Sequence, residues 1–417
     1  MLAIARQRIL VVNYSMVCGG VEKACLSLLA ALPPDRFDVT LLLVSKTGAY
    51  LEQIPSWVTV KELALHPDDR HEMIVGRRAA LIQSLKRGKL IRVLRSLIRR
   101  AYCMGCVARP LWRCVEFDAM LDRVHFDDTE YDCAISYSDS LVCVAIVAER
   151  IDSRRRLVWF HGDFPDQHIR QENYQHYYRK YDRLFAVSSA LVDKLNSRIP
   201  SLPRPVELFP HIIDPSDYAA KAAAGKGFTD VFTGLRILSV GRLSEQKGFD
   251  LAVEVHARLI RAGYPVRWYV VGGGHAENSL RDAIQSAGVQ DSFMLLGQDA
   301  NPYPYFAQCD IYVQPSRYEG YCLTIAEARA FFKPIVCTDF AGAREQIVDG
   351  ETGLIVPCEV DAIYQAVKRL LDTSALRQTF SRNLSRSQIG TIEAARRLAA
   401  VIAGDDEPSM TGSSIPV

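Results

Sequence analysis

Ser316-Arg-Tyr-Glu319-Gly-Tyr-Cys-Leu-Thr-Ile-Ala-Glu327-Ala328 is the stretch that decides the fold of this chain. An apolar strand-like run, Asp310-Ile-Tyr-Val-Gln314, precedes it, and small, helix-forming residues follow. We therefore expect Glu319 on a loop at the carboxyl end of a strand and Glu327 inside the next helix. Open α/β sheets bind ligands at this edge. Two carboxylates there suit the hydroxyl groups of a ribose or a sugar.

Length and composition describe an ordinary globular chain. It has 417 residues, of which 49% are hydrophobic and 24% charged, with a net charge of +2. This length exceeds what one core usually organises, so two domains are expected. The near-neutral charge indicates no particular partner.

The cysteines predict a reducing compartment. Eleven cysteines in so long a chain do not make a disulfide framework, and most lie in apolar stretches typical of small core residues. Cys103-x-x-Cys106 has no second pair at zinc spacing, so no metal site is predicted. The short apolar run at the N-terminus has the character of a strand rather than a signal peptide, and no run of about 20 apolar residues occurs. These features predict a cytoplasmic protein.

Strand and helix patterns alternate along the chain in two successive series. The first opens with a strand at 8–13, and the second opens with a strand at 235–240. Continuous apolar strands of this kind belong to parallel sheets covered on both faces. Clustered prolines and then an Ala/Gly/Lys stretch separate the two series, which indicates a linker.

The fold class predicted is therefore α/β, with two doubly wound Rossmann-like domains facing across a cleft. The predicted divisions are residues 1–213, a linker at 214–234, a second domain at 235–376, and C-terminal helices with a polar tail at 377–417.

A cationic loop follows the first strand of the second domain. In Gly241-Arg242-Leu-Ser-Glu-Gln-Lys247-Gly248, glycine permits close backbone approach and two cations stand at the sheet edge. This arrangement suits a diphosphate. A solvated loop with two surface charges is the alternative, and spacing alone does not choose between them.

Three more features stand at predicted strand ends. Gly19-Gly20, at a helix start, offers N–H groups and a positive helix end to a phosphate or sugar, although a tight turn explains it equally. His161 points into the cleft if the sheet is parallel, where it would bond a sugar hydroxyl, transfer a proton, or be merely structural. Gly272-Gly-Gly274 lacks the full G-x-G-x-x-G fingerprint, and turn geometry alone accounts for it.

Several catalytic motifs are absent from the sequence. No strict Asp-x-Asp occurs, which removes the simplest metal–diphosphate clamp. Walker A, G-x-S-x-G and H-E-x-x-H are absent too, which excludes several NTPase, hydrolase and metalloprotease classes.

A basic stretch runs from residue 73 to 115, with eleven Arg or Lys and no acid. Within it Arg92, Arg95 and Arg99 share one face of an amphipathic helix pattern. One interpretation is docking on an anionic membrane surface, to which each near-surface cation contributes about 1 kcal/mol. The other has the apolar face on the sheet and the arginines in water. No aromatic platform accompanies the charge, so nucleic acid is not predicted as a partner.

Together these motifs resemble those of the GT-B glycosyltransferases of family 4, a large retaining family. The resemblance covers nearly the whole chain and is strongest from Ser239 to Pro357. The run 239–248 resembles the family's diphosphate-binding loop. The E-x7-E pair, then Gly342-Ala-Arg-Glu345 and the run 349–356, resemble its C-terminal signature. Many members carry an acidic residue where this chain has Gly273, so that turn receives no role beyond geometry.

The resemblance implies a role for each matching position. Arg242 and Lys247 would neutralise the leaving diphosphate, Glu327 would bind the ribose, and Glu319 would contact the donor sugar. His161 matches a cleft histidine within reach of that sugar. The remaining implied positions border the donor or the acceptor side of the cleft: Gly241, Gly320, Tyr321, Cys322, Leu323, Gly272, Gly297, Gly19 and Gly20.

The implied reaction is retaining transfer of a hexosyl unit from a nucleotide-diphosphate sugar, UDP- or GDP-linked, to a hydroxyl of a glycan or polyprenyl-linked acceptor. The resemblance places it in surface polysaccharide or glycolipid synthesis, with no further cofactor and no metal. The basic stretch would bring the enzyme to the inner face of the membrane. The alternatives are a GT-B phosphorylase, a nucleotide-sugar epimerase or a non-catalytic nucleotide-binding module. The sequence gives no indication of oligomeric state.

Overall fold

The computed structural model describes residues 6–64, 121, 124, 126, 128–162, 172–198, 202–387 and 390–405. The basic stretch with Arg92, Arg95 and Arg99 lies outside these residues, as does the Cys103/Cys106 pair. The predicted membrane docking therefore stays a prediction.

The first domain is built on a seven-stranded sheet in the order β3-β2-β1-β4-β5-β6-β7. Its strands are β1 (Gln7–Asn13), β2 (Phe37–Leu43), β3 (Thr59–Glu62), β4 (Cys133–Ser136), β5 (Arg156–Phe160), β6 (Arg183–Ala186) and β7 (Val206–Leu208). The described helices between them are α1 (Gly20–Ala31), η1 (Ala49–Gln53), α6 (Leu141–Glu149), α7 (Glu172–Tyr178) and α8 (Ser189–Arg198). Central strands such as β4 are buried along their whole length, as expected where helices cover both faces.

The second domain is built on a six-stranded sheet in the order β10-β9-β8-β11-β12-β13. Its strands are β8 (Leu235–Val240), β9 (Val266–Val271), β10 (Phe293–Gly297), β11 (Ile311–Gln314), β12 (Ile335–Thr338) and β13 (Gly353–Val356). The described helical elements that follow β7 along the chain are α9 (Pro215–Ala224), η2 (Glu245–Lys247), α10 (Phe249–Arg261), α11 (Glu277–Ala287), α12 (Tyr303–Gln308), α13 (Leu323–Ala330), α14 (Val360–Asp372), α15 (Ser374–Arg386) and α16 (Ile392–Ala403).

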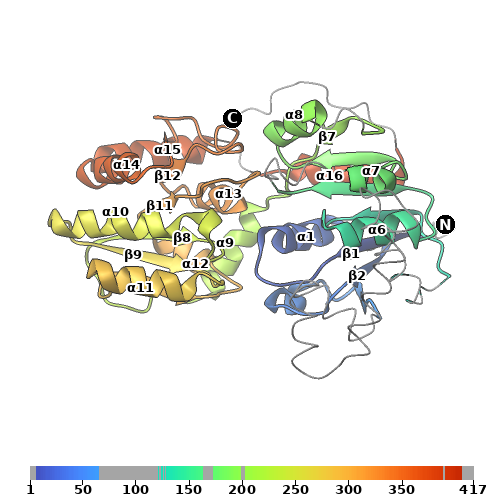
Figure 1. Cartoon of the computed structure of the whole chain (residues 1–417), viewed down its shortest axis with the longest axis horizontal. Helices are drawn as coiled ribbons and strands as arrows, with labels where there is room; N and C mark the ends of the chain where they lie inside the picture. The colour runs from blue at the N-terminus through green and yellow to red at the C-terminus, as the bar shows by residue number, and fades with distance from the viewer. Residues whose placement is uncertain are drawn as a thin grey trace, which may run out of the picture.

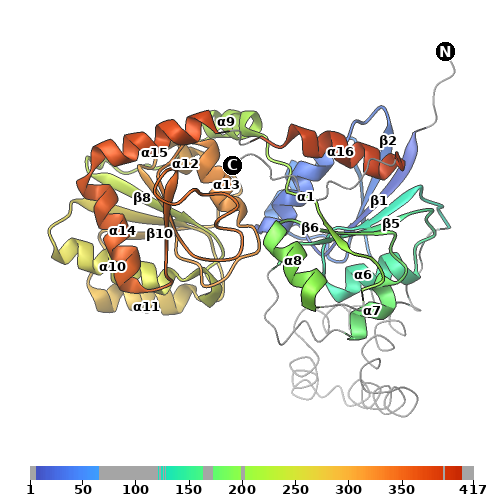
Figure 2. The same ribbon diagram turned by 90° about the horizontal axis from the view of Figure 1, so that it is seen from above.

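Every pairing between the described strands is parallel, which confirms the predicted fold class. In each sheet the strand order reverses direction once, between β1 and β4 in the first and between β8 and β11 in the second. Ligands of doubly wound sheets bind outside the carboxyl ends of the strands at such switch points. The two domains lie side by side with α1 and α13 at their facing sides (Figure 1, Figure 2).

The last helix crosses back to the first domain. Leu398 and Ile402 of α16 are fully buried in the core of the first sheet, and α16 lies over that domain in both views (Figure 1, Figure 2). The crossing is anchored at Thr391, whose hydroxyl accepts the N–H of Ile213 at 2.7 Å and donates to the carbonyl of His211 at 2.9 Å. The predicted linker 214–234 contains helix α9, which packs against α12. The domain boundaries stay a prediction.

Candidate functional site

A cavity of about 370 Å³ lies between the domains, at the carboxyl ends of both sheets. All but one of the site residues predicted within the described part of the chain line it. The exception is Gly297, whose neighbour Gln298 lines the cavity instead. The predicted residues that line it are Gly19, Gly20, His161, Gly241, Arg242, Lys247, Gly272, Glu319, Gly320, Tyr321, Cys322, Leu323 and Glu327.

Glu319 is held by a chain of buried polar side chains that starts on β11. The Tyr312 hydroxyl donates to Gln314 Oε1 at 2.5 Å, and Gln314 Nε2 donates to Ser316 Oγ at 2.8 Å. Ser316 Oγ in turn donates to Glu319 Oε1 at 2.8 Å. The carboxylate is only 7% exposed. Because these hydrogen bonds link Glu319 in series to Tyr312 and Gln314, strand β11 fixes the orientation of the Glu319 carboxylate.

Lys247 forms an ion pair with Glu319 from the loop after β8. Burial of the ammonium lowers its pKa, but the neighbouring carboxylate outweighs burial, so the pKa of Lys247 is raised above its usual value. The two charges largely cancel. Among the described residues no hydrogen bond or ion pair engages the exposed Arg242 guanidinium on the same loop, so its charge is available to an anion.

Glu327 lies one turn into α13 and is 1% exposed. Lys23, from α1 of the first domain, forms an ion pair with its Oε1. Neither carboxylate oxygen makes a directed hydrogen bond to a described residue. Besides this ion pair, the buried carboxylate has acceptor positions that hydroxyl groups of a ligand could use.

The starts of two helices meet at the cavity. A methyl group on Gly20 would lie 3.9 Å from Leu323 Cδ1, so the first turn of α1 abuts the first turn of α13. Cys322, which precedes α13, has the left-handed φ of 68°, a strained conformation for a non-glycine residue. Gln346 stabilises this turn by donating to the carbonyls of Tyr321 and Cys322. Unpaired N–H groups and the positive ends of both helices favour an anion here.

His161 lies at the end of β5 in its neutral form. Its Nε2 lies 2.8 Å from the Tyr137 carbonyl, which can only accept, so Nε2 carries the proton. Burial lowers the pKa of His161 to about 4, against a smaller opposing effect of that hydrogen bond. Its Nδ1 is therefore an acceptor, and it is buried without a partner among the described residues. The His161 backbone N–H donates to Asp139 Oδ2 at 3.3 Å.

Among the lining residues that sequence reasoning missed are Lys23, Asp139 and His211. The His211 ring stacks on His161 with centroids 5.3 Å apart, and meets the ring of Tyr321 edge-on at 5.4 Å. Burial, reinforced by His161, lowers the pKa of His211 well below its usual value. No pattern pointed to His211, because it stands in the proline cluster read as a linker. Lys23 was detectable, since it falls in the first turn after Gly19-Gly20.

The glycine turn at 272–274 has a packing explanation. A Cβ on Gly272 would collide with the carbonyl of Gly241, and one on Gly274 would collide with the carbonyl of Leu243. The turns after β8 and β9 therefore pack backbone to backbone.

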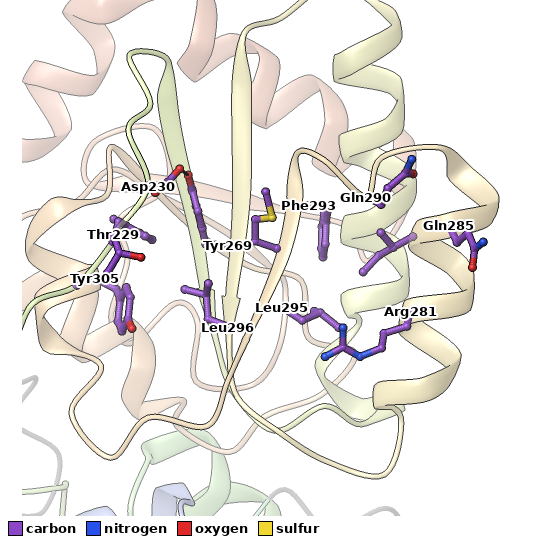
Figure 3. A pocket seen from close by; sticks show the side chains of 14 residues that line it. Thr229, Asp230, Tyr269, Arg281, Gln285, Gln290, Phe293, Leu295, Leu296 and Tyr305 are labelled. Carbon is purple, nitrogen blue, oxygen red and sulfur yellow. Dashed lines mark hydrogen bonds between the residues drawn. The ribbon is translucent and has the colours of Figure 1, made fainter.

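A second cavity, of about 720 Å³, lies wholly in the second domain, around the edge strand β10 and α11. Figure 3 shows its lining, which contains none of the predicted site residues. Its acid, Asp230, is already paired with Arg267 at 2.5 Å and hydrogen-bonded to the Tyr269 hydroxyl at 2.5 Å. Despite its smaller volume, the interdomain cavity holds the unpaired polar groups and is the candidate site.

Within the described residues no group of three or more His, Cys, Asp and Glu could hold a metal ion. In the same part of the chain, no helix is both long and apolar enough to cross a membrane. The eight cysteines that the structure describes are all free.

Two Rossmann-like domains with the cavity between the carboxyl ends of their sheets define the GT-B class of fold. The crystal structure of Anabaena HepE in complex with UDP and glucose superposes with a TM-score of 0.68 over 95% of this chain and 100% of that one, at 17% identity. Residues 233–386 match the model of the family described as glycosyl transferases group 1. The matched residues lie in the second domain.

Curated relatives match over part of their length. A Campylobacter jejuni N-acetylgalactosamine-N,N'-diacetylbacillosaminyl-diphospho-undecaprenol 4-alpha-N-acetylgalactosaminyltransferase is 31% identical over 49% of this chain and 54% of its own. The alpha-D-kanosaminyltransferase of Streptomyces kanamyceticus is 31% identical over 35% of this chain and 39% of its own. The matched segments thus span about half or less of these relatives.

Proposed function

We propose that the protein is a retaining glycosyltransferase that moves a hexosyl unit from a nucleotide-diphosphate sugar to a hydroxyl group. One observation supports this proposal most: the buried Glu327, with free acceptor positions, shares a cavity with the cations Arg242 and Lys247 and two helix starts. Ribose hydroxyls would bond Glu327, and the diphosphate would lie against the cations and the N–H groups of the α13 turn. The Anabaena relative was crystallised with UDP-glucose, which favours testing UDP-sugars first.

In the proposed reaction the bond between the anomeric carbon and the diphosphate oxygen breaks, and its electron pair stays on the diphosphate. The acceptor oxygen bonds to the same face of the anomeric carbon and gives its proton to the departing phosphate oxygen, so configuration is retained. Arg242, Lys247 and the helix ends stabilise the developing negative charge electrostatically. Glu319 and the Nδ1 acceptor of His161 would orient the sugar hydroxyls.

The acceptor proposed is a glycan or a polyprenyl-linked sugar. The Campylobacter relative's name specifies a diphospho-undecaprenol acceptor, and the Rhizobium meliloti relative's name specifies a lipopolysaccharide-core mannosyltransferase. Such an acceptor would bring the enzyme to the cytoplasmic face of a membrane, to which the basic stretch 73–115 would bind.

Binding of the donor is tested by thermal shift with UDP, GDP, ADP and their sugars. A bound nucleotide raises the melting temperature in proportion to RT ln(1 + [L]/Kd). We expect one base to give a shift that Glu327→Gln abolishes and that Glu351→Gln, on an exposed side chain of the same domain, keeps. No shift with any nucleotide would refute the proposed donor class.

Membrane docking is tested by flotation with vesicles that contain anionic lipid. We expect the protein to float, and the combined change of Arg92, Arg95 and Arg99 to Gln to reduce flotation. Flotation that is absent, or unaffected by these changes, rules out this role for the basic stretch.

A further inference from the structure

Gln314 places an amide in a fully buried strand. It is the last residue of β11 (Ile311–Gln314), in which every residue is buried, and it is itself 0% exposed. Burial of an amide is costly unless its hydrogen bonds are made, and a methionine would fill the same length of space without that cost. The partners of the amide are therefore the place to look for its purpose.

The Gln314 amide is held in one orientation by two hydroxyl groups. Its Oε1 accepts from the Tyr312 hydroxyl at 2.5 Å and from the hydroxyl of Thr324, in the first turn of α13, at 3.0 Å. With both hydroxyls on the oxygen side, the amide nitrogen faces Ser316, to which it donates at 2.8 Å. Ser316 belongs to the loop that carries Glu319. Gln314 does not line the interdomain cavity, whereas Glu319 does.

The direction of these hydrogen bonds sorts the two oxygens of Glu319. The Gln314 nitrogen can only donate, so Ser316 Oγ accepts from it and gives its own single proton to Glu319 Oε1, at 2.8 Å. The Lys247 ammonium pairs with the same oxygen. Among the described residues nothing bonds Oε2. The protein thus holds one carboxylate oxygen and leaves the other to a ligand hydroxyl.

We propose that Gln314 is a positioning residue for sugar transfer, which acts through Ser316 to hold Glu319 in the orientation that receives the donor sugar. The inference rests on the proposed function, which assigns the sugar hydroxyls to Glu319. Gln314 itself touches no substrate. A side chain that is held in advance loses less conformational freedom when a ligand binds, so its hydrogen bond contributes more to affinity. Without the Gln314 amide, the Ser316 hydroxyl is free to rotate and Glu319 is held less firmly.

The effect of Gln314 should be selective for the transferred sugar. Under the proposed function the nucleoside diphosphate binds through Glu327, the loop cations and the N–H groups of the α13 turn. That turn is held separately by Gln346, which donates to the carbonyls of residues 321 and 322. Only the nucleotide sugar carries the hydroxyl groups that Glu319 would bond. Loss of the amide should therefore weaken binding of the nucleotide sugar and spare the nucleoside diphosphate.

Calorimetry on the full chain measures this difference. The probes are UDP with UDP-glucose, or GDP with GDP-mannose, whichever pair binds the wild type. Gln314→Met keeps the length of the side chain and removes the amide. We expect it to weaken binding of the nucleotide sugar about fivefold to tenfold and to change binding of the nucleoside diphosphate by less than about twofold. Equal effects on both probes, or no effect on the nucleotide sugar, would overturn the proposal.

A second variant and a control separate this role from general stability. Ser316→Ala removes the next link, so it should give the same selective loss, and it also serves if Gln314→Met does not fold. Because the links act in series, the double variant should bind no more weakly than either single one, and additive losses would contradict the proposal. The control, Ser292→Ala, removes a 2.8 Å hydrogen bond to the buried His256 beside β10, which β9 and β8 separate from β11. It should leave both affinities unchanged.

Hydrogen–deuterium exchange of the ligand-free protein tests the positioning without any donor. The amide of Arg317 is bonded to the carbonyl of Gln246 at 2.8 Å and reports on the Glu319 loop. Gln314→Met should speed its exchange about threefold or more relative to the amides of β8, and Ser292→Ala should not. Unchanged exchange at this amide would overturn the proposal. If exchange responds as expected but no nucleotide binds the wild type, the proposed function fails and the positioning of Glu319 stands.

Discussion

Replacing Lys247 by Met should destabilise the second domain, because the buried carboxylate of Glu319 would lose the positive charge that pairs with it. The side chains of Lys247 and Glu319 are 17% and 8% exposed. Removing one partner of a buried ion pair costs about 3–5 kcal/mol. Here Ser316 still donates to Glu319 at 2.8 Å and the cavity admits some water, so we expect about 2–3 kcal/mol.

The assay is hydrogen–deuterium exchange of the full chain, read on the slowest amides of β8 and β11, which report global opening of this domain. The raised pKa of Lys247 means that its contribution is present below its unfolded pKa of about 10.4 and is lost as pH rises through the folded value. Measurements at pH 7 therefore capture all of it. Lys368→Met, which breaks the exposed helical pair with Asp372, is the control and should leave these amides unchanged.

A double-mutant cycle separates the pair from its parts. Glu319→Gln removes the stranded charge, so Lys247→Met combined with Glu319→Gln should recover most of the protection lost in Lys247→Met alone. Strictly additive effects of the two changes, or full protection in Lys247→Met, would refute the view that Glu319 is a buried charge balanced by Lys247.

Buried histidines, an interdomain carboxylate and a tight glycine turn lead to three further predictions. Burial lowers the pKa values of His161 and His256 to about 4. The pKa of an unfolded histidine is about 6.5, so the contribution of each neutral buried histidine to stability is present above pH 6.5 and is lost as the pH falls. The free energy of unfolding should fall by about 3 kcal/mol per histidine on acidification to pH 4, and urea denaturation across this pH range measures it. Glu345 accepts the N–H groups of Ser189 and Ala190 at 3.0 and 2.9 Å across the domains, and Glu345→Ala should cost about 1 kcal/mol and speed exchange in the first turn of α8. Gly272→Ala should lower the free energy of unfolding by about 1–3 kcal/mol, measured by urea denaturation, since its Cβ meets the Gly241 carbonyl.

The apolar pattern of the sequence did not reveal two short strands of the first sheet. β7 (Val206–Leu208) lies among the prolines that suggested a linker, and β3 (Thr59–Glu62) lies at the sheet edge with mostly exposed side chains. Both pair with a neighbour whose own apolar run was clear. Their strand state depends on that neighbour rather than on local sequence.

The sequence alone determined the α/β class, the two domains and most of the cavity lining. Apolar runs with helical patterns between them specify parallel sheets, and residues just after such strands must collect at the carboxyl edge. This local rule identified Glu319, Glu327, Arg242 and Lys247.

Only the tertiary structure decided which charges meet. Three contacts join residues that are from 50 to 304 positions apart in the sequence. They are the ion pairs Lys247–Glu319 and Lys23–Glu327 and the stacking of His211 on His161. Strand and helix periodicity carry no information about such pairs. Lys247 with Glu319 and His211 with His161 depend on how distant segments pack within one domain, whereas Lys23 with Glu327 depends on how the two domains dock. The two glutamates were thus found from local patterns, while only the tertiary structure shows that Lys247 of the same domain and Lys23 of the first domain are their partners.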